Sequence, residues 1–158
     1  MTDPVIRYLG LLGDLDAIEV LQATPTRLIE LFDSFSYDEL NEPYAPGKWT
    51  RREVLAHLAD VELVTGFRFR QLAAVPGVEV QPFDQDLWSR RYRQLEPTLA
   101  LEAFRALRAW NLALFATFSL EDWLAEAFHP ERGFESNDLM VRMLAGHDLN
   151  HLEQLVRG

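Results

Sequence analysis

Apolar residues recur along this chain at intervals of three and four positions, which is the period of an amphipathic helix. No run of alternating β-branched residues interrupts this pattern, so we expect an all-α fold. The four predicted long helices cover residues 24–36, 50–74, 97–118 and 136–157. Long helices with irregular connections are typical of a four-helix bundle, in which inward-facing side chains build any ligand site.

Capping residues support three of the four helix starts. Thr24 precedes Pro25, which suits the first helical position because its missing N–H costs no hydrogen bond there. Thr50 is followed three residues later by Glu53, the pattern of a capping box. Ser136 is a favourable N-cap for the last helix.

The connections carry turn-forming residues and short helical segments. Proline and glycine predict loops at residues 41–49, 75–86 and 128–136, with room for a short extended piece in the second. Short extra helices or turns are expected near residues 15–22, 86–92 and 119–127. No repeat or low-complexity linker divides the chain, and its length suits one domain over residues 1–158.

The third helix has a broad apolar face. We expect that face to comprise Leu101, Phe104, Ala106, Leu107, Trp110, Leu114 and Phe118. The tryptophans Trp49, Trp88 and Trp110 are expected in the core rather than as platforms for a substrate.

Two histidines replace hydrophobic residues on the inner stripe of the last helix. That stripe runs through Met140, Met143, Leu144, His147, His151 and Leu155. Residues four apart lie about 5–6 Å apart at Cβ, so His147 and His151 can meet one divalent ion. Taken alone, the pair fits equally well two partly buried imidazoles that bond to neighbouring groups or water.

His57 strengthens the metal hypothesis. It lies on the inner face of the second long helix, near its middle, between Val54 and Val61. If the second and fourth helices are neighbours, His57 converges with His147 and His151 at one depth of the bundle. Three protein ligands leave a coordination position open, as in catalytic sites. Three imidazoles suit Zn, Ni, Fe and Cu alike.

Metal-bound histidines commonly pass their second ring N–H to a carboxylate or carbonyl group. Asp60 lies one turn from His57, and Asp148 and Asn150 lie within the C-terminal histidine pair. Asp148 and Asp60 are therefore the candidates for a catalytic or positioning role. The alternative is that Asp60, Glu62 and Asp148 are surface charges.

Two further segments are candidates for the edge of the site. His129 is expected to be an exposed loop residue, although it could overhang the open end of the bundle. The segment 84–93 could bring Asp84 and Asp86 to the pocket mouth. For Asp86, helix capping is an equally good explanation.

The composition limits the classes of partner. The 158 residues carry a net charge of -10, which disfavours nucleic-acid binding. The local arginine group is interpreted as a solvated face with ion pairs, and consists of Arg68, Arg70, Arg90, Arg91 and Arg93. Tyr92 and Arg91 could alternatively bind an acidic substrate. Cysteine is absent, which excludes disulfides, thiolate metal sites and a cysteine nucleophile.

The N-terminal segment "MTDPVIRYLGLLGDLD" is acidic and lacks the basic-then-apolar layout of a signal peptide. No apolar run approaches the ~18 residues that span a bilayer. We therefore expect a cytoplasmic protein without a membrane partner.

Several segments together resemble the DinB-like superfamily of metal-dependent enzymes. The resemblance is carried by "GKWTRREVLAHLADVE" at residues 47–62 and "LAGHDLNHLEQL" at residues 144–155. The pieces "PFDQDLWSRRY", "LRAWNLALF" and "HPERG" are similar to one branch of that superfamily. The resemblance extends from about Gly47 to Leu155.

The resemblance implies a four-helix bundle whose divalent metal is held by His57, His147 and His151. It also implies relatives that act as S-transferases or isomerases with low-molecular-weight thiols, and frequent homodimers. Because the chain has no cysteine, such a thiol would have to come from a small co-substrate. A coordinating metal deprotonates a thiol outright.

Two other functions remain open. The motif "HDLNH" is similar to the H-E-x-x-H pattern of metalloproteases, but Asp is shorter than Glu and no strand edge is predicted to hold a peptide. Hydrolysis of a small molecule by metal-activated water is the better alternative, and needs a nearby carboxylate base. The non-enzymatic alternative is a metal-binding or dimerising helical module with a stress-related role.

Overall fold

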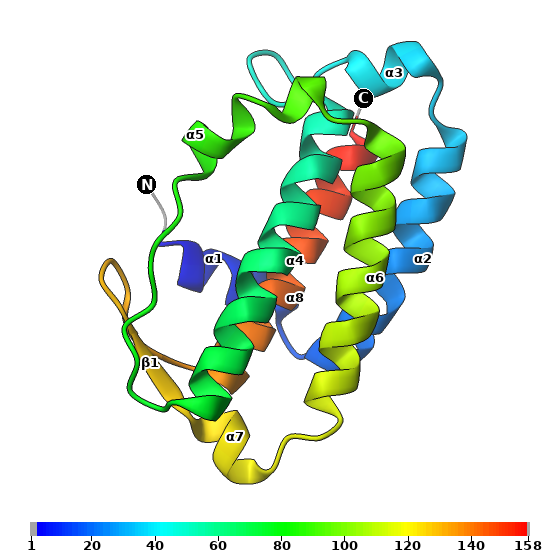
Figure 1. Cartoon of the computed structure of the whole chain (residues 1–158). Coiled ribbons are helices and arrows are strands. Elements are labelled where there is room, and N and C mark those ends of the chain that lie inside the picture. The colour runs from blue at the N-terminus through cyan, green and yellow to red at the C-terminus, as the bar shows by residue number, and fades with distance from the viewer. Residues whose placement is uncertain (1–2, 158) are drawn as a thin grey trace.

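The computed structural model describes residues 3–157, most of which form a bundle of four long helices (Figure 1). These helices are α2 (Ala17–Ser34), α4 (Arg51–Ala74), α6 (Pro97–Phe115) and α8 (Asn137–Val156). Helix α4 packs against α6 and α8, and α2 packs against the same two helices. The predicted all-α four-helix bundle is confirmed, and α4 and α8 are neighbours as the convergence of three histidines requires.

Shorter elements surround the bundle. Helix α1 (Pro4–Leu12), which the sequence pattern did not predict, packs against α8. The connections contain α3 (Tyr37–Asn41), α5 (Gln85–Ser89), the 3₁₀ turn η1 (Tyr92–Gln94) and α7 (Leu120–Leu124). Within residues 3–157, no helix is both long enough and apolar enough to cross a membrane.

Two of the three predicted helix starts are confirmed. Thr50 and Glu53 form the reciprocal capping box of α4, and the Ser136 side chain caps α8. Helix α6 begins at Pro97 as expected, but ends at Phe115 rather than at residue 118.

The predicted start at Thr24 is wrong. Helix α2 begins at Ala17, capped by Asp16, and runs through both Thr24 and Pro25. An interior proline removes the donor that would bond to the carbonyl four residues earlier, here Leu21. The Leu21 oxygen instead accepts a 2.9 Å hydrogen bond from Arg108 Nη1 on α6. A distant side chain therefore supplies the donor that the local sequence lacks.

The loop predicted at residues 128–136 is partly a β-hairpin. Strands β1 (Glu126–His129) and β2 (Gly133–Ser136) pair antiparallel. Residues 78–80 add an extended segment, since the Phe128 amide donates to the Val78 carbonyl and Phe128 accepts from the Val80 amide. Strands of four residues are too short to produce a clear alternating pattern. The hairpin and this extended segment close one end of the bundle, beside the site described below.

The buried face of α6 differs from the predicted one. Leu101 and Phe104 are buried as expected, whereas Trp110 is 68% exposed. The positions of Arg108 and Asn111 are buried instead. Their side chains form a polar layer in the bundle, because Arg108 bonds to Glu62 on α4 and to Asp148 on α8.

Candidate metal centre

Three histidines from two neighbouring helices meet inside the bundle. The Nε2 atom of His147 on α8 lies 3.0 Å from Nε2 of His57 on α4 and 3.1 Å from Nε2 of His151. Suitable ligand atoms of all three lie within 4.8 Å of one another, and all three residues are buried. His57 stands in the second turn of α4 rather than near its middle. The sequence prediction that these residues converge is confirmed, and we call them the histidine triad.

Burial keeps the triad neutral. Loss of hydration lowers the pKa of His57 to about 3 and that of His151 to about 4. Burial and the neighbouring His151 also hold the pKa of His147 well below its ordinary value. A neutral imidazole has a nitrogen lone pair to offer, which is the form that binds metals.

The spacing of the three nitrogens fits a divalent ion. Two ligand nitrogens at about 2.0–2.1 Å from one ion lie roughly 2.8–3.4 Å apart at coordination angles of about 90–109°. The observed separations of 3.0 and 3.1 Å fall in this range. Three imidazoles whose nitrogens lie this close together, with no acidic side chain among them, are therefore a suitable donor set for Zn, Ni or Fe.

One outer ring nitrogen of the triad has a clear partner. His151 Nδ1 donates to Gln154 Oε1 at 2.6 Å, which leaves the lone pair of this imidazole on Nε2. The Nδ1 atoms of His57 and His147 are buried without a hydrogen-bond partner within the described part of the chain. Gln154 was not among the predicted positioning residues, although its place three residues after His151 on one helix face was a usable signal.

The predicted acidic partners lie elsewhere. Asp148 is buried and both of its carboxylate oxygens accept from Arg108, so its interpretation as a surface charge is wrong. The same correction holds for Glu62, which shares that arginine. Asp60 is partly buried, which raises its pKa against the opposing effect of Tyr92. Between residues 3 and 157, no carboxylate forms a hydrogen bond or ion pair with the triad.

Asn150, the third predicted partner, forms no hydrogen bond with the ring nitrogens of the triad in the described part of the chain. Its side-chain oxygen accepts a 2.5 Å hydrogen bond from Arg7 on α1. This bond fixes α1 to the histidine-bearing helix.

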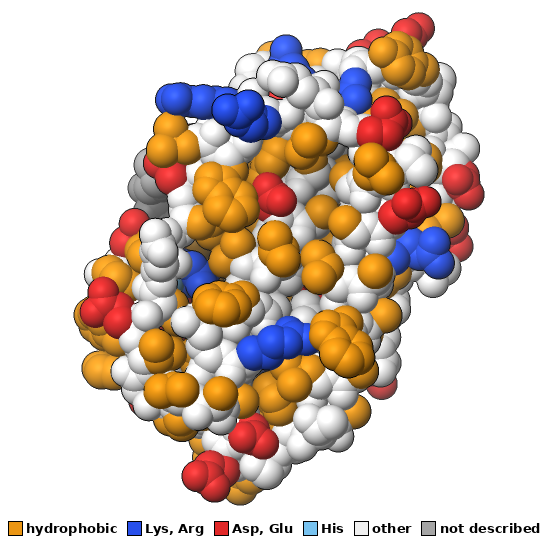
Figure 2. All heavy atoms as spheres, in the orientation of Figure 1, with side chains coloured by type: hydrophobic (Ala, Val, Ile, Leu, Met, Phe, Trp, Pro, Cys, Tyr) orange, Lys and Arg blue, Asp and Glu red, His pale blue; other side chains and the backbone are white. Residues whose placement is uncertain are grey.

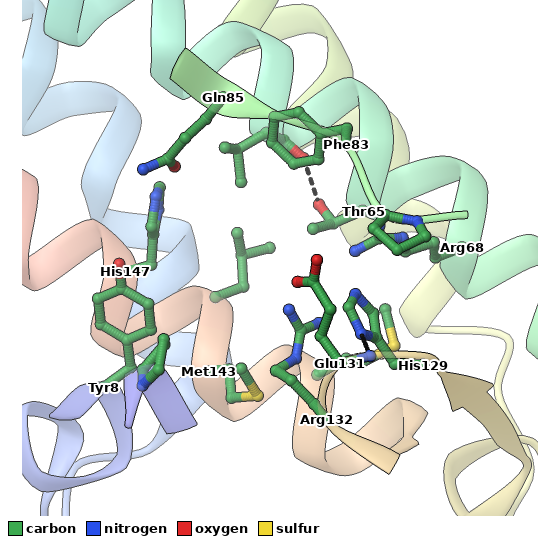
Figure 3. A pocket seen from close by; sticks show the side chains of 15 residues that line it. Tyr8, Thr65, Arg68, Phe83, Gln85, His129, Glu131, Arg132, Met143 and His147 are labelled. Carbon is green, nitrogen blue, oxygen red and sulfur yellow. Dashed lines mark hydrogen bonds between the residues drawn. The ribbon is translucent and has the colours of Figure 1, made fainter. Parts of the chain in front are cut away.

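A cavity of about 280 Å³ opens beside the triad (Figure 3). His147 lines one end, and Arg68 and His129 line the other. His129 is only 2% exposed, so its predicted exposed loop position is wrong. Hairpin formation explains this burial, because His129 ends strand β1.

A second cavity of about 240 Å³ also adjoins the triad. His57 and His151 line it together with the half-buried Trp49, whose ring centroid is 4.8 Å from that of His57. Tyr8 and Gln85 line both cavities, so the two spaces are adjacent at these side chains.

The segment 84–93 contributes fewer residues to the edge of the site than predicted. Only Gln85 lines a cavity at the triad, and Asp84 rather than Asp86 caps α5. Tyr92 is buried in the apolar core.

Two predictions about large side chains were wrong. Trp88 is 41% exposed and Trp110 is 68% exposed, so neither is a core residue.

In the arginine group, Arg90, Arg91 and Arg93 are exposed as expected. Arg68 is buried instead.

The fold and site together define a helical bundle with a three-histidine centre between its second and fourth long helices. The chain belongs to the DinB superfamily, whose family model matches residues 21–155.

Two relatives give this membership more detail. A Bacillus subtilis protein, named "Putative metal-dependent hydrolase YfiT", is 27% identical over 116 residues, which cover 72% of this chain and 65% of the relative. A protein from Oceanobacillus iheyensis with a similar name is 25% identical over 87% of this chain and 81% of its own length. The chain thus spans about two thirds to four fifths of these relatives.

Solved structures show the same architecture. YfiT from Bacillus subtilis superposes with a TM-score of 0.79 at 25% identity, over 89% of this chain and 84% of YfiT. A mycothiol-dependent maleylpyruvate isomerase superposes with a TM-score of 0.70 at 14% identity, over 89% of this chain and 60% of the isomerase. The second likeness is one of fold alone.

Proposed function

We propose that this protein is a metal-dependent enzyme in which His57, His147 and His151 hold one divalent ion. The observation that carries the proposal is the convergence of three buried, neutral Nε2 atoms at the edge of two cavities. The names of the relatives support metal dependence. Three protein ligands would leave room for a reacting group on the cavity side.

A bound divalent metal would lower the pKa of a thiol or a water molecule that approaches it. The residues around the triad favour the thiol. Hydrolysis calls for a carboxylate base close to the attacking water, but Asp148 and Glu62 are held by Arg108. A thiol held at the metal would release its proton to the solvent, and the resulting thiolate would need no carboxylate base beside it. The preferred reaction is therefore transfer of a small-molecule thiol to a small electrophile.

The hydrolase remains the second candidate because the relatives carry that name. Among the described residues, Glu131 is the one acidic side chain that lines either cavity and could act as a base. It lies at the end of the cavity away from His147 (Figure 3). A hydrolytic reaction would have to use this distant carboxylate or proceed without a carboxylate base.

Elemental analysis of purified variants tests the metal site. We expect His57→Ala, His147→Ala and His151→Ala each to lose most of the bound divalent metal. His129→Ala is the matched control, since this fourth histidine is also buried but lies outside the triad. Full metal content in any of the three triad variants would refute the three-histidine site.

Thermal melts with small thiols separate the two reactions. We expect thiols, but not their alcohol analogues, to raise the melting temperature of the metal-loaded protein and to leave the metal-free protein unchanged. If thiol and alcohol raise the melting temperature equally, or neither raises it, the hydrolase becomes the favoured function.

A further inference from the structure

Arg68 is a buried cation without an ion-pair partner. It is 6% exposed and lines the 280 Å³ cavity. Its Nη2 atom donates to the Gln81 carbonyl at 2.7 Å, and no carboxylate of residues 3–157 forms an ion pair with it. A guanidinium carries five N–H donors, so most of them remain free to face the cavity.

The surroundings of Arg68 make its buried charge unfavourable for folding stability. Burial and the nearby charge of Arg132 lower the pKa of Arg68, while Glu135 and Glu131 partly offset them. A charge removed from water destabilises a fold unless it is paired. The hydrogen bond to the Gln81 carbonyl does not neutralise the charge of Arg68, which indicates that the unpaired charge serves a ligand.

His129 adds a second donor at the same end of the cavity. Its Nδ1 atom accepts a 3.2 Å hydrogen bond from the Glu131 amide, so the ring proton lies on Nε2. Figure 3 shows His129 beside Arg68, with His147 at the opposite end of the cavity. A fixed Nε2–H and a guanidinium together can bind the oxygens of an anion.

The carboxylates nearby do not cancel this charge. Glu135 is buried and makes two hydrogen bonds to Arg132, so that pair is neutral. Glu131 lines the cavity at this end (Figure 3), but it is exposed and makes no side-chain ion pair within the described residues, so its side chain can turn toward solvent when an anion binds. The positive charge of Arg68 is then available to an anionic ligand in the cavity.

The cavity follows one face of α4 from the triad to Arg68. His57, Val61, Thr65 and Arg68 are spaced by four, four and three residues, so they share that face. Eleven residues of helix rise by about 16 Å, and helical side chains lean toward the N-terminus, so the guanidinium lies closer to the triad than its backbone does. Between the two ends the lining is mainly apolar, with Val61, Met140 and Leu144.

We propose that Arg68 and His129 form an anion subsite that binds the carboxylate or phosphate end of a small molecule whose other end reaches the histidine triad. The inference rests on the proposed function and deepens it, because it assigns an acidic, elongated ligand with an apolar middle to the same site. The subsite also explains how a chain with a net charge of -10 could bind an acidic ligand.

Mercapto acids test both ends of the cavity together. The full-length protein is loaded with Co²⁺ and titrated with 3-mercaptopropionate, 6-mercaptohexanoate and their carboxamides, while the thiolate–cobalt absorption is followed. For at least one chain length, we expect the carboxylate to bind about 10-fold or more tightly than its carboxamide, as suits a charge-assisted bond. Arg68→Gln should abolish this preference, and the exposed Arg105→Gln on α6 should retain it. Equal affinities of carboxylate and carboxamide at both lengths overturn the subsite.

Phosphate binding tests the anion subsite in the absence of the metal. Isothermal titration of the metal-free protein with inorganic phosphate should show binding that weakens at least 10-fold in Arg68→Gln and is unchanged in Arg105→Gln. Equal phosphate affinity in wild type and Arg68→Gln overturns the inference. If every thiol leaves the cobalt spectrum unchanged while phosphate still depends on Arg68, the thiol reaction fails and the anion subsite stands. If Arg68→Gln does not fold, the comparison of carboxylate with carboxamide on the wild type decides alone.

Discussion

Protonation of the histidine triad links single residues to the stability of the metal-free protein. Burial lowers the pKa of His57 to about 3 and that of His151 to about 4, whereas the unfolded chain takes up these protons near the ordinary value of 6.5. Between these values the unfolded state binds more protons than the folded state, so stability rises with pH. The contribution of the triad is therefore complete above about pH 6.5 and is lost as the pH falls toward 3.

We expect the melting temperature of the metal-free protein to fall steeply between pH 7 and pH 4, as followed by circular dichroism in the presence of a chelator. His57→Gln removes one of the three titrating groups, so its melting temperature should depend less on pH over that interval. A wild-type melting temperature that is flat from pH 7 to pH 4 would contradict the neutral, buried triad.

The triad could be predicted because each histidine occupies an apolar position on a long helix with a clear period. The roles of Arg68 and His129 could not be predicted in this way. Their burial depends on the short hairpin and on the extended segment 78–80, which contact each other across nearly 50 residues. Local sequence patterns carry no information about such contacts.

At the scale of elements, the four helices are joined by one buried polar layer. Arg108 on α6 donates to Glu62 on α4, to Asp148 on α8 and to the Leu21 carbonyl on α2. Although burial acts to lower it, the charges of Asp148 and Glu62 raise the pKa of Arg108. Removing one member of a buried ion cluster leaves the remaining charges unpaired.

Arg108→Ala should therefore lower the free energy of unfolding by about 3–5 kcal/mol, measured by urea denaturation. Arg105→Ala changes an exposed arginine on the same helix, and its effect should remain within about 0.5 kcal/mol. Comparable losses in both variants would show that the polar layer does not hold the helices together.

The packing of α1 on α8 depends on a glycine next to the triad. A Cβ atom at Gly146 would lie 2.0 Å from the Tyr8 carbonyl oxygen, a contact with backbone that cannot be relieved by a side-chain rotation. Because Tyr8 lines both cavities, a shift of α1 would also alter the space in front of His147.

Gly146→Ala should accordingly lower the melting temperature and expose α1 to limited proteolysis. Gly10→Ala is the matched control on α1 itself, where an added Cβ meets no atom within 4 Å. At such an open helical site the change to alanine should be neutral or stabilising by up to about 1 kcal/mol. Resistance of Gly146→Ala to proteolysis at the wild-type level would show that α1 is not held by this close contact.

The ends of helices were predictable where neighbouring residues in the sequence set them. They were not predictable where a residue from another helix sets them. The capping box of Thr50 and the cap of Ser136 act within one turn, so the starts of α4 and α8 follow from the sequence. Pro25 is a local signal for a helix start, but Arg108 compensates for it from another helix. The continuation of α2 through Pro25 is thus a tertiary effect.

At the scale of the whole molecule, one face of the bundle remains apolar and uncovered. Figure 2 shows hydrophobic side chains spread over the face formed by α4 and α6. Leu63 and Phe67 on α4 are 52% and 63% exposed, and Leu99 and Trp110 on α6 are 63% and 68% exposed. None of these four lines either cavity at the triad, so covering this face would leave the site open.

The homodimer implied by the sequence resemblance stays a prediction, and this face is where we expect it to form, because exposed apolar clusters favour association. Sedimentation velocity should show a dimer for the wild type and a monomer for Trp110→Glu, since a charge in an apolar interface loses its hydration without gaining a partner. Leu120→Glu places the same charge on α7 rather than on α4 or α6, at a position that is 74% exposed, and should remain dimeric. A monomeric wild type would refute the dimer, while a dimeric Trp110→Glu would place the interface on another surface. In either case metal content should match the wild type, because the triad is buried inside the bundle whereas Leu63 and Phe67 are exposed on its surface.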